Sequence, residues 1–275
     1  MAVTDAVEQV VAAALAEDVG SGDVTTEAVV DQGEVASATL LLKEPGVVCG
    51  LGVAETVFRE LGDDVSFEAL VEDGTALDRP SAVARVAGPA RAILTGERVA
   101  LNFLGRLSGI ATLTRRYVVA VAGTGVTILD TRKTTPGLRA LEKYAVACGG
   151  GRNHRFGLSD GILIKDNHVR VAGSVATAVE RARAASDLPV EVECDTLEQV
   201  RQALAAGVDA MLLDNMSLDD LRTAAELVAG RARLEASGGV TLENVRAVAG
   251  TGVDEISVGA LTHSARSLDV SLELA

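Results

Sequence analysis

The chain has 275 residues, 48% hydrophobic residues and a formal net charge of −14 at neutral pH, a composition typical of a globular protein with a substantial core. A broadly acidic chain lacks the basic face that nucleic-acid binding requires. No apolar run approaches the roughly 18 to 20 residues of a membrane span, and the N-terminus carries acids early and has no basic start, unlike a signal peptide.

Lysine and aromatic residues are scarce. Acidic residues outnumber basic ones 39 to 25, aromatic residues make up 2% of the chain, and only 4 of the basic residues are lysines. This bias resembles proteins of a high-salt cytoplasm, whose carboxylate-rich surface stays hydrated while salt screens its repulsion. An ordinary acidic protein from a GC-rich genome is the alternative. The joint depletion of lysine and aromatic residues favours the halophilic interpretation.

The three cysteines, Cys49, Cys148 and Cys194, are odd in number and far apart, with no CxxC pair. This spacing argues against a disulfide framework or a zinc cluster. We therefore expect a cytoplasmic protein.

The first part of the chain has an α+β pattern. Residues 4–16 place apolar positions at helical spacing, which predicts an amphipathic helix. Residues 34–86 alternate apolar and polar residues between Pro-Gly and Asp-Gly turns, so strands are expected there, interrupted by a helix at 52–61. A long helical pattern over residues 90–122 is expected to link two domains.

The first domain is therefore predicted as an α+β unit over residues 1–110. Residues 266–275 form a tail that is able to pack back on it. The remaining segment, residues 111–265, is predicted to form the second domain.

Strands and helices alternate regularly in this second domain. Strand-like runs occupy residues 126–130, 161–165, 189–194, 210–214, 232–236 and 254–258. Helical patterns lie between most of them, at residues 173–186, 196–206, 218–229 and 241–249. This alternation indicates βαβ units and a parallel sheet, and six such units suit an α/β barrel, complete or incomplete. A doubly wound sheet is the rival, but no GxGxxG turn follows the first strand.

The scarce lysines are concentrated in one window, residues 126–169. The basic residues and histidines of this window are Arg132, Lys133, Arg139, Lys143, Arg152, His154, Arg155, Lys165 and His168. An acidic protein that gathers its cations in one place is expected to bind a multiply anionic ligand there. Some of these residues have simpler interpretations, because Arg139 and Lys143 lie four apart on a probable helix and suit surface ion pairs.

Chemically active side chains follow the strands. Glu193 and Asp214 are carboxylates at adjacent strand ends, where a parallel barrel places its active site. They could bind Mg²⁺, hold sugar hydroxyls or act as an acid/base pair, and a structural ion pair with the basic window is the alternative. Arg132, Lys133 and Lys165 are likewise placed at strand ends.

Two glycine-containing turns follow the last two strands. Ser237-Gly238-Gly239 and Val258-Gly259-Ala260 allow backbone N–H groups to approach a ligand closely, with helix N-termini expected behind them. A consecutive pair of such turns favours a phosphate site, although loop-closing glycines are the simpler interpretation of each one.

These segments together resemble a known family. The blocks DTRKTTPGLRALEKYAV, GGGRNHRFGLSDGILIKDNH, VEVECDTLEQ, MLLDN, LEASGGV and ISVGALTHS are similar to those of quinolinate phosphoribosyltransferase, also called nicotinate-nucleotide pyrophosphorylase (carboxylating). The resemblance implies that quinolinate and phosphoribosyl pyrophosphate (PRPP) react to give nicotinate mononucleotide, pyrophosphate and CO₂, with Mg²⁺ and without an organic cofactor. It also implies an α/β fold with an N-terminal α/β sandwich (α+β) domain and a C-terminal open or incomplete α/β barrel of the phosphate-binding TIM-like type. The same resemblance implies a homodimer, or a hexamer, in which one subunit covers the barrel mouth of its partner.

The resemblance also implies roles for particular residues. Quinolinate would be bound by Arg132, His154, Arg155 and Lys165, and by Arg98 from the partner subunit. Lys133 would contact the pyrophosphate side of PRPP, and Glu193 and Asp214 would face its ribose and metal. The 5′-phosphate would be bound by Ser237, Gly238, Gly259 and His263. A paralogue of the same fold acting on another base, and a non-catalytic phosphosugar-binding barrel, are the rival interpretations.

Overall fold

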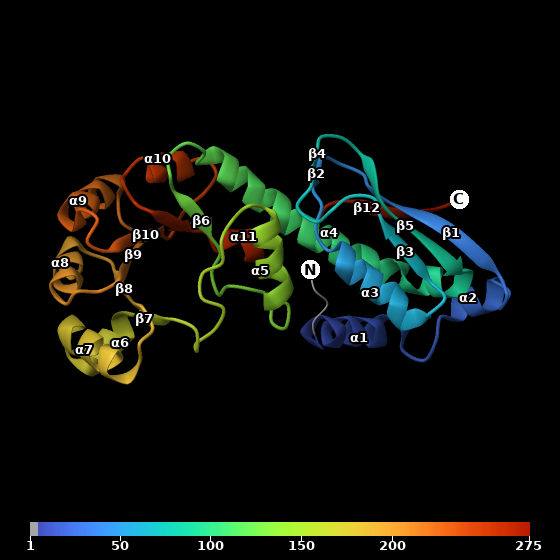
Figure 1. Ribbon diagram of the computed structural model, residues 1–275, viewed down its shortest axis with the longest axis horizontal. Helices are drawn as coiled ribbons and strands as arrows, with labels where there is room; N and C mark the ends of the chain where they lie inside the picture. Colours follow the sequence, from blue (N-terminus) through green and yellow to red (C-terminus); the bar gives the residue numbers. More distant parts are fainter. Residues whose placement is uncertain (1–4) are drawn as a thin grey trace. The chain divides into compact units, whose positions relative to one another are not determined.

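The computed structural model describes residues 5–275 and divides the chain into two compact units (Figure 1). The N-terminal unit comprises the residues up to 115 together with residues 134–150 and 261–275, and the barrel unit comprises residues 116–133 and 151–260. The first predicted helix is observed as α1 (Asp5–Val19); residue 4, where the prediction began, lies outside the described residues.

The N-terminal unit is built on an antiparallel sheet. Its strand order is β12 (Val270–Leu274), β1 (Val35–Leu42), β5 (Ser81–Pro89) and β3 (Ser66–Ala69), and a separate pair joins β2 (Gly46–Val47) to β4 (Ala76–Leu77). The edge strand β12 comes from the end of the chain and pairs with β1, with Leu272 opposite Leu40. The C-terminal segment therefore completes a sheet whose other strands lie far before it in the sequence.

One amphipathic helix supplies much of the core of this unit. Helix α3 (Leu51–Leu61) buries Val53, Val57 and Phe58, and the ring of Phe58 stacks on Phe67 of β3 with a centroid distance of 6.2 Å. Removal of such apolar surface from water stabilises the fold by about 25 cal/mol per Å². Helices α2 (Val24–Val29) and α5 (Arg139–Cys148) also belong to this unit; the sequence patterns did not predict α2.

The long helix α4 (Ala90–Ala120) begins in this unit and is crossed by the C-terminal segment. At Gly109 an added Cβ atom would lie 1.9 Å from the carbonyl oxygen of Arg266, so only glycine allows the backbone to pass. One turn earlier, the carbonyl of Gly105 accepts the N–H of Leu268 at 3.0 Å. Among the helices of the described residues, none is long and apolar enough to cross a membrane.

The barrel unit contains a six-stranded parallel sheet, which confirms the predicted open α/β barrel. Its strand order is β6 (Thr127–Leu129), β11 (Glu255–Ser257), β10 (Arg233–Ser237), β9 (Ala210–Asp214), β8 (Val190–Cys194) and β7 (Ile162–Ile164). All six correspond to strands predicted from the sequence. In the described part of the chain β6 and β7 do not pair with each other, so the barrel is open between them.

Helices α7 (Val175–Ala185), α8 (Leu197–Ala205), α9 (Leu218–Val228) and α10 (Val245–Ala249) lie outside this curved sheet (Figure 1). All four lie within or overlap the predicted helical patterns. Helix α6 (Asp166–Ala172), directly after β7, was not predicted. The short α11 (Ala260–His263) begins at the Val258-Gly259-Ala260 turn, behind which a helix N-terminus was expected.

The strands have a period of two that separates an apolar side from a polar one. Val190, Val192 and Cys194 of β8 are buried on one side, and Met211 and Leu213 occupy the equivalent positions of β9, opposite Val192 and Cys194. The alternate residues of the strands are largely polar, namely Glu191, Glu193, Asp214, Arg233, Glu235, Ser237, Glu255 and Ser257. The apolar side packs beneath the helices, and the barrel interior is therefore polar.

Candidate active site

A cavity of about 380 Å³ opens at the carboxyl ends of the barrel strands. Eight of the predicted site residues line it, namely Arg132, Lys133, His154, Arg155, Lys165, Glu193, Asp214 and Ser237. They come from the ends of β6, β7, β8, β9 and β10 and from the loop before β7. The structure therefore brings together, in one cavity, side chains that span more than a hundred residues of sequence, from Arg132 to Ser237.

The loop that carries Arg152 to Arg155 runs along the free edge of β6. Arg152 forms a parallel bridge with Leu129, its N–H donates to the carbonyl of Ile128 at 2.8 Å, and its carbonyl accepts the N–H of Asp130 at 3.2 Å. The buried carboxylate of Asp130 in turn accepts the N–H of His154 at 2.9 Å. The loop is thus hydrogen-bonded to the first barrel strand like a short additional strand.

Arg155 is held at its backbone and at its guanidinium. Its Nη1 donates to the carbonyl of Gly161 at 3.0 Å, and a Cβ atom at Gly161 would lie 3.2 Å from the Cβ of Arg155. Burial, and then the positive charge of Arg132, lower the pKa of Arg155. Two cations that repel each other across a cavity favour the binding of an anion between them.

Asp160 closes the loop between Arg155 and Gly161. Its carboxylate accepts the N–H groups of Phe156 and Gly157 at 2.6 and 2.7 Å, a typical role for aspartate in a turn. The sequence RFGLSDG therefore specifies a compact loop that presents Arg155.

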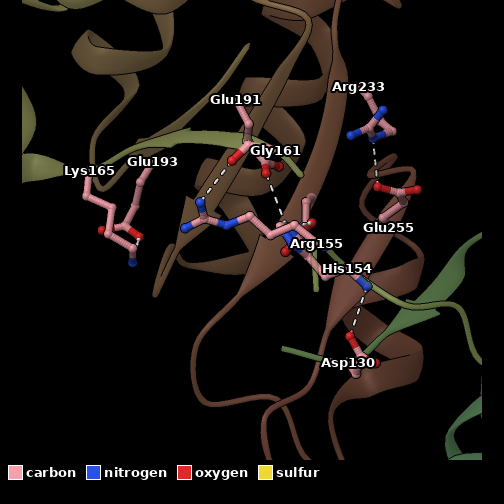
Figure 2. Close-up of polar contacts among 10 residues, drawn as sticks. Asp130, His154, Arg155, Gly161, Lys165, Glu191, Glu193, Arg233 and Glu255 are labelled. Atoms are coloured by element: carbon pink, nitrogen blue, oxygen red, sulfur yellow. Dashed lines mark hydrogen bonds and ion pairs between the residues drawn. The ribbon is translucent and has the colours of Figure 1, made fainter. Parts of the chain in front are cut away.

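The ring of His154 lies against two buried glutamates, Glu191 (labelled in Figure 2) and Glu235. Its Nε2 is 3.1 Å from an oxygen of Glu191 and 3.3 Å from an oxygen of Glu235, and its Nδ1 accepts the N–H of Arg155 at 2.8 Å. Both ring nitrogens thus already face protein groups.

Lys165 and Glu193 are paired with each other at the ends of β7 and β8. The Nζ of Lys165 is 2.5 Å from a carboxylate oxygen of Glu193 (Figure 2). Asp214, at the end of β9, accepts a hydrogen bond from the side chain of Asn215 at 2.8 Å. A ligand that binds both a cation and a carboxylate here would replace the contact between Lys165 and Glu193.

The glycine turn after β10 has little space for a side chain. Gly238 has a φ angle of +89°, and an added Cβ atom would lie 2.2 Å from Oδ1 of Asn215 and 2.9 Å from its backbone nitrogen. Glycine is the residue that adopts this conformation without strain. Gly259 lies between β11 and α11 in the barrel unit.

Two predicted site residues belong to the N-terminal unit. Arg98 is exposed on α4 and lines a cavity of about 280 Å³ with Asp18, Asp23 and Thr95. His263 is exposed at the end of α11, where its Nδ1 lies 2.6 Å from the hydroxyl of Ser264.

Sequence reasoning missed Glu191 and Glu235. The signal was present, because each is a polar residue between two apolar neighbours of its strand, and an inward-facing glutamate in a barrel strand is unusual enough to mark a site. His168, whose role the sequence left open, accepts the N–H of Lys165 at its Nδ1 (2.9 Å) and caps α6.

Fold and site together define a class of protein: an open α/β barrel that gathers arginines, lysines and carboxylates at the carboxyl ends of its strands, the usual position of a barrel active site. The family profile of the quinolinate phosphoribosyl transferase C-terminal domain matches residues 110–273, and that of the N-terminal domain matches residues 23–108. The chain belongs to the quinolinate phosphoribosyltransferase family.

Comparison with individual relatives gives the same family. The nicotinate-nucleotide pyrophosphorylase (carboxylating) of Mycobacterium leprae is 47% identical over 277 residues, covering 98% of each chain. The probable enzyme of the same name from Bacillus subtilis is 46% identical and covers 94% of this chain and 90% of that protein. The solved structure of nicotinate-nucleotide pyrophosphorylase from Francisella tularensis is 40% identical, with a TM-score of 0.96 over 98% of this chain and 96% of that one.

Proposed function

We propose that the protein transfers the phosphoribosyl group of PRPP to quinolinate with loss of CO₂, giving nicotinate mononucleotide and pyrophosphate in NAD biosynthesis. The observation that carries this proposal is the single cavity that joins Arg132, Arg155 and Lys165 to Glu193 and Asp214. Membership of the quinolinate phosphoribosyltransferase family supports the same reaction.

The cations suit a pyridine dicarboxylate. Arginine presents a planar set of donors that matches a carboxylate in two parallel hydrogen bonds, and Arg132 and Arg155 both line the cavity. With Lys165 they supply three positive charges for the two carboxylates of quinolinate. His154 forms part of the same wall.

The second substrate requires a different set of groups. Lys133 would contact the pyrophosphate of PRPP, and the carboxylates of Glu193 and Asp214 would face its ribose. The 5′-phosphate would be bound by the turns at Ser237, Gly238 and Gly259, and by His263. Backbone N–H groups in glycine turns and at helix N-termini are common phosphate ligands.

Glu193 and Asp214 would also hold Mg²⁺. Both offer carboxylate oxygens to the cavity, and an all-oxygen donor set fits Mg²⁺ better than zinc. When bound, Mg²⁺ supplies positive charge that neutralises the pyrophosphate leaving group. Phosphoribosyltransferases commonly use a divalent metal, and no organic cofactor is needed for the steps below.

The residues of the cavity account for the chemistry. Pyrophosphate leaves through a transition state in which the ribose resembles an oxocarbenium ion, and Glu193 and Asp214 stabilise the positive charge at its anomeric carbon. The pyridine nitrogen attacks that carbon. The ring, now cationic, accepts the electron pair that remains when the 2-carboxylate leaves as CO₂, and a proton then replaces it.

The active enzyme is proposed to be a cytoplasmic homodimer with a shared site, or a hexamer built from such dimers. Arg98 is exposed on α4 and would reach the quinolinate of the partner subunit.

The proposal is tested by measuring pyrophosphate release from PRPP and Mg²⁺ with quinolinate or with nicotinate, in low and in molar KCl. Release with quinolinate alone, accompanied by CO₂, is the expected result. Turnover with nicotinate instead would contradict the assignment of the second carboxylate and favour a paralogue. No turnover with either substrate in any salt would favour a non-catalytic phosphosugar-binding barrel. A requirement for high salt would support the halophilic interpretation of the acidic surface.

A further inference from the structure

Two buried glutamates inside the barrel have no role in the reaction described above. Glu191 is 6% exposed and Glu235 is 1% exposed. Within the described residues, one oxygen of Glu191 and both oxygens of Glu235 have no partner that satisfies hydrogen-bond geometry. Burial of carboxylates is costly, so a pair of them facing one side chain requires an explanation.

That side chain is His154, and each of its polar groups has a defined neighbour. Its backbone N–H donates to Asp130 at 2.9 Å, its Nδ1 accepts the N–H of Arg155 at 2.8 Å, and its Nε2 lies 3.1 Å from Glu191 and 3.3 Å from Glu235. The orientation of the ring is therefore set from both sides. A ring nitrogen that faces carboxylates acts as a donor, so Nε2 carries a proton.

The same geometry argues against a metal ion at this cluster, although one ligand atom from each of the three residues lies within 4.8 Å of the others. A neutral imidazole whose Nδ1 accepts a hydrogen bond has its proton on Nε2, and an imidazolium has protons on both nitrogens. In neither form does Nε2 keep the lone pair that a metal would need. The cluster is better explained as a hydrogen-bonded support for the ring.

The support continues from the ring to Arg155. The N–H of Arg155 points at Nδ1 of His154, while its Nη1 donates to Gly161. Gly161 also leaves room for the aliphatic part of this side chain, because a Cβ there would lie 3.2 Å from the Cβ of Arg155. Tilting the ring of His154 would therefore move the backbone from which Arg155 extends.

We infer that Glu191 and Glu235 are positioning residues: through the ring of His154 they fix Arg155, and so determine how firmly the site binds a carboxylate of the substrate. The inference rests on the proposed function, in which Arg155 binds quinolinate. It also assigns to His154 a role that acts through Arg155, since both of its ring nitrogens are engaged by the protein.

The test compares Glu235→Leu, which removes the oxygen that faces Nε2 at 3.3 Å, with Glu235→Gln, which keeps an amide oxygen at that position. Because a misplacement of about 1 Å can cost on the order of 100-fold in rate, Glu235→Leu is expected to raise the KM for quinolinate at least tenfold while the KM for PRPP changes little. Glu235→Gln is expected to stay within about threefold of the parent. If the two variants are equally impaired, the charge of Glu235 matters and the polar oxygen that it places beside Nε2 does not, which overturns the inference.

A double-mutant cycle with Arg155→Lys separates positioning from general damage. The effects of Glu235→Leu and Arg155→Lys should be strongly non-additive, because both act on the same guanidinium. Additive effects would contradict the inference. Glu255→Gln is the matched control: Glu255 lines the same interior cavity but pairs with Arg152 and Arg233 instead of His154, so it should leave the KM for quinolinate unchanged.

A second readout does not depend on activity. In protein labelled with ¹⁵N-arginine, the Nε–H signal of Arg155, assigned by its loss in Arg155→Lys, should be sharp in the parent and in Glu235→Gln and broadened in Glu235→Leu. An unchanged signal would overturn the positioning role, whether or not the parent turns over quinolinate. Failure of the parent to use quinolinate would instead overturn the proposed function. If Glu235→Leu does not fold, Glu191→Leu and Glu191→Gln are compared by the same kinetics and the same Arg155 signal, with the same expected difference between Leu and Gln.

Discussion

The two ends of the barrel interior use the same residue types for different purposes. At the amino ends of the strands, a cavity of about 200 Å³ is lined by Arg152 and Arg233, and both face the carboxylate of Glu255, at 3.5 and 2.7 Å. At the carboxyl ends, Arg132 lies near Arg155 and its charge lowers the pKa of that residue, after burial. Arginines are thus neutralised by the protein at one end and left to repel each other at the other.

The difference shows how a polar interior can be both stable and reactive. A compensated arginine contributes to folding and has little attraction left for a ligand, whereas adjacent cations store unfavourable energy that an anionic ligand relieves. The cluster of His154, Glu191 and Glu235 lies between the two, since His154 and Glu235 line both cavities, as does Arg155. Variants at each end should therefore separate effects on catalysis from effects on stability.

The largest effect is expected at the carboxyl end. Arg155→Ala should lower kcat/KM for quinolinate on the order of 10³-fold. It would remove the two charge-assisted hydrogen bonds proposed between the guanidinium and a carboxylate of quinolinate, which are worth about 1.5–3 kcal/mol each. Arg233→Ala, the equivalent change at the amino end, should alter kcat/KM by less than about threefold. Steady-state kinetics of the two variants make the comparison, and equal losses would show that the two ends do not differ.

Glu193→Gln is expected to have the next largest effect, and on a different parameter. It removes negative charge that we assign to the oxocarbenium-like transition state, so kcat should fall on the order of 10²-fold. It also removes the carboxylate 2.5 Å from Lys165, which leaves that lysine available to the substrate, so the KM for quinolinate should not rise. A rise in KM with unchanged kcat would contradict the assignment.

A smaller effect is expected for Gly238→Ala. The new Cβ atom would lie 2.2 Å from Oδ1 of Asn215, at a φ angle of +89°, and a side chain in this conformation costs about 1–2 kcal/mol. The turn should shift, and the KM for PRPP should rise about tenfold while the KM for quinolinate changes little. Gly239→Ala is the control: it follows in the same turn but has open space at its Cβ.

Much of this organisation could be predicted from the sequence because it depends on local patterns. Regular alternation of strands and helices predicted the parallel barrel, and each of the six strands was found within one or two residues of its expected position. The positions of Arg132, Lys165, Glu193 and Asp214 followed from the rule that strand ends carry the site. Their meeting in one cavity is a consequence of the parallel register.

The remainder depended on contacts that are distant in the sequence. Nothing local in VSLEL predicts that β12 pairs with β1, more than 200 residues earlier. Helix α6 is short and polar and depends on the cap that His168 provides, so hydrophobic periodicity could not detect it. The partnership of His154 with Glu191 and Glu235 likewise exists only once three separate segments have folded.

At the amino end, Glu255→Gln should lower stability without affecting catalysis. Arg152 and Arg233 would lose their charged partner, whose side chain is 8% exposed, at a cost of about 1–2 kcal/mol. For a chain of this size the thermal midpoint should fall by a few degrees. A larger change in kcat/KM than in stability would mean that the amino end takes part in the reaction after all.

The smallest expected effect extends the comparison to a compensated arginine at the protein surface. The side chain of Arg266 donates to Glu44 and lowers the pKa of that carboxyl from its ordinary value of 4.5 to about 2. Because the pKa is lower in the folded state, the pair stabilises the fold above pH 4.5, and this contribution is lost as the pH falls towards 2. The free energy of unfolding of Glu44→Gln should therefore differ from that of the parent near neutral pH and converge with it below about pH 2. Molar KCl should reduce the difference because the pair is partly exposed, and a difference that stays constant between pH 5 and pH 2 would show that Arg266 does not stabilise the charged form of Glu44.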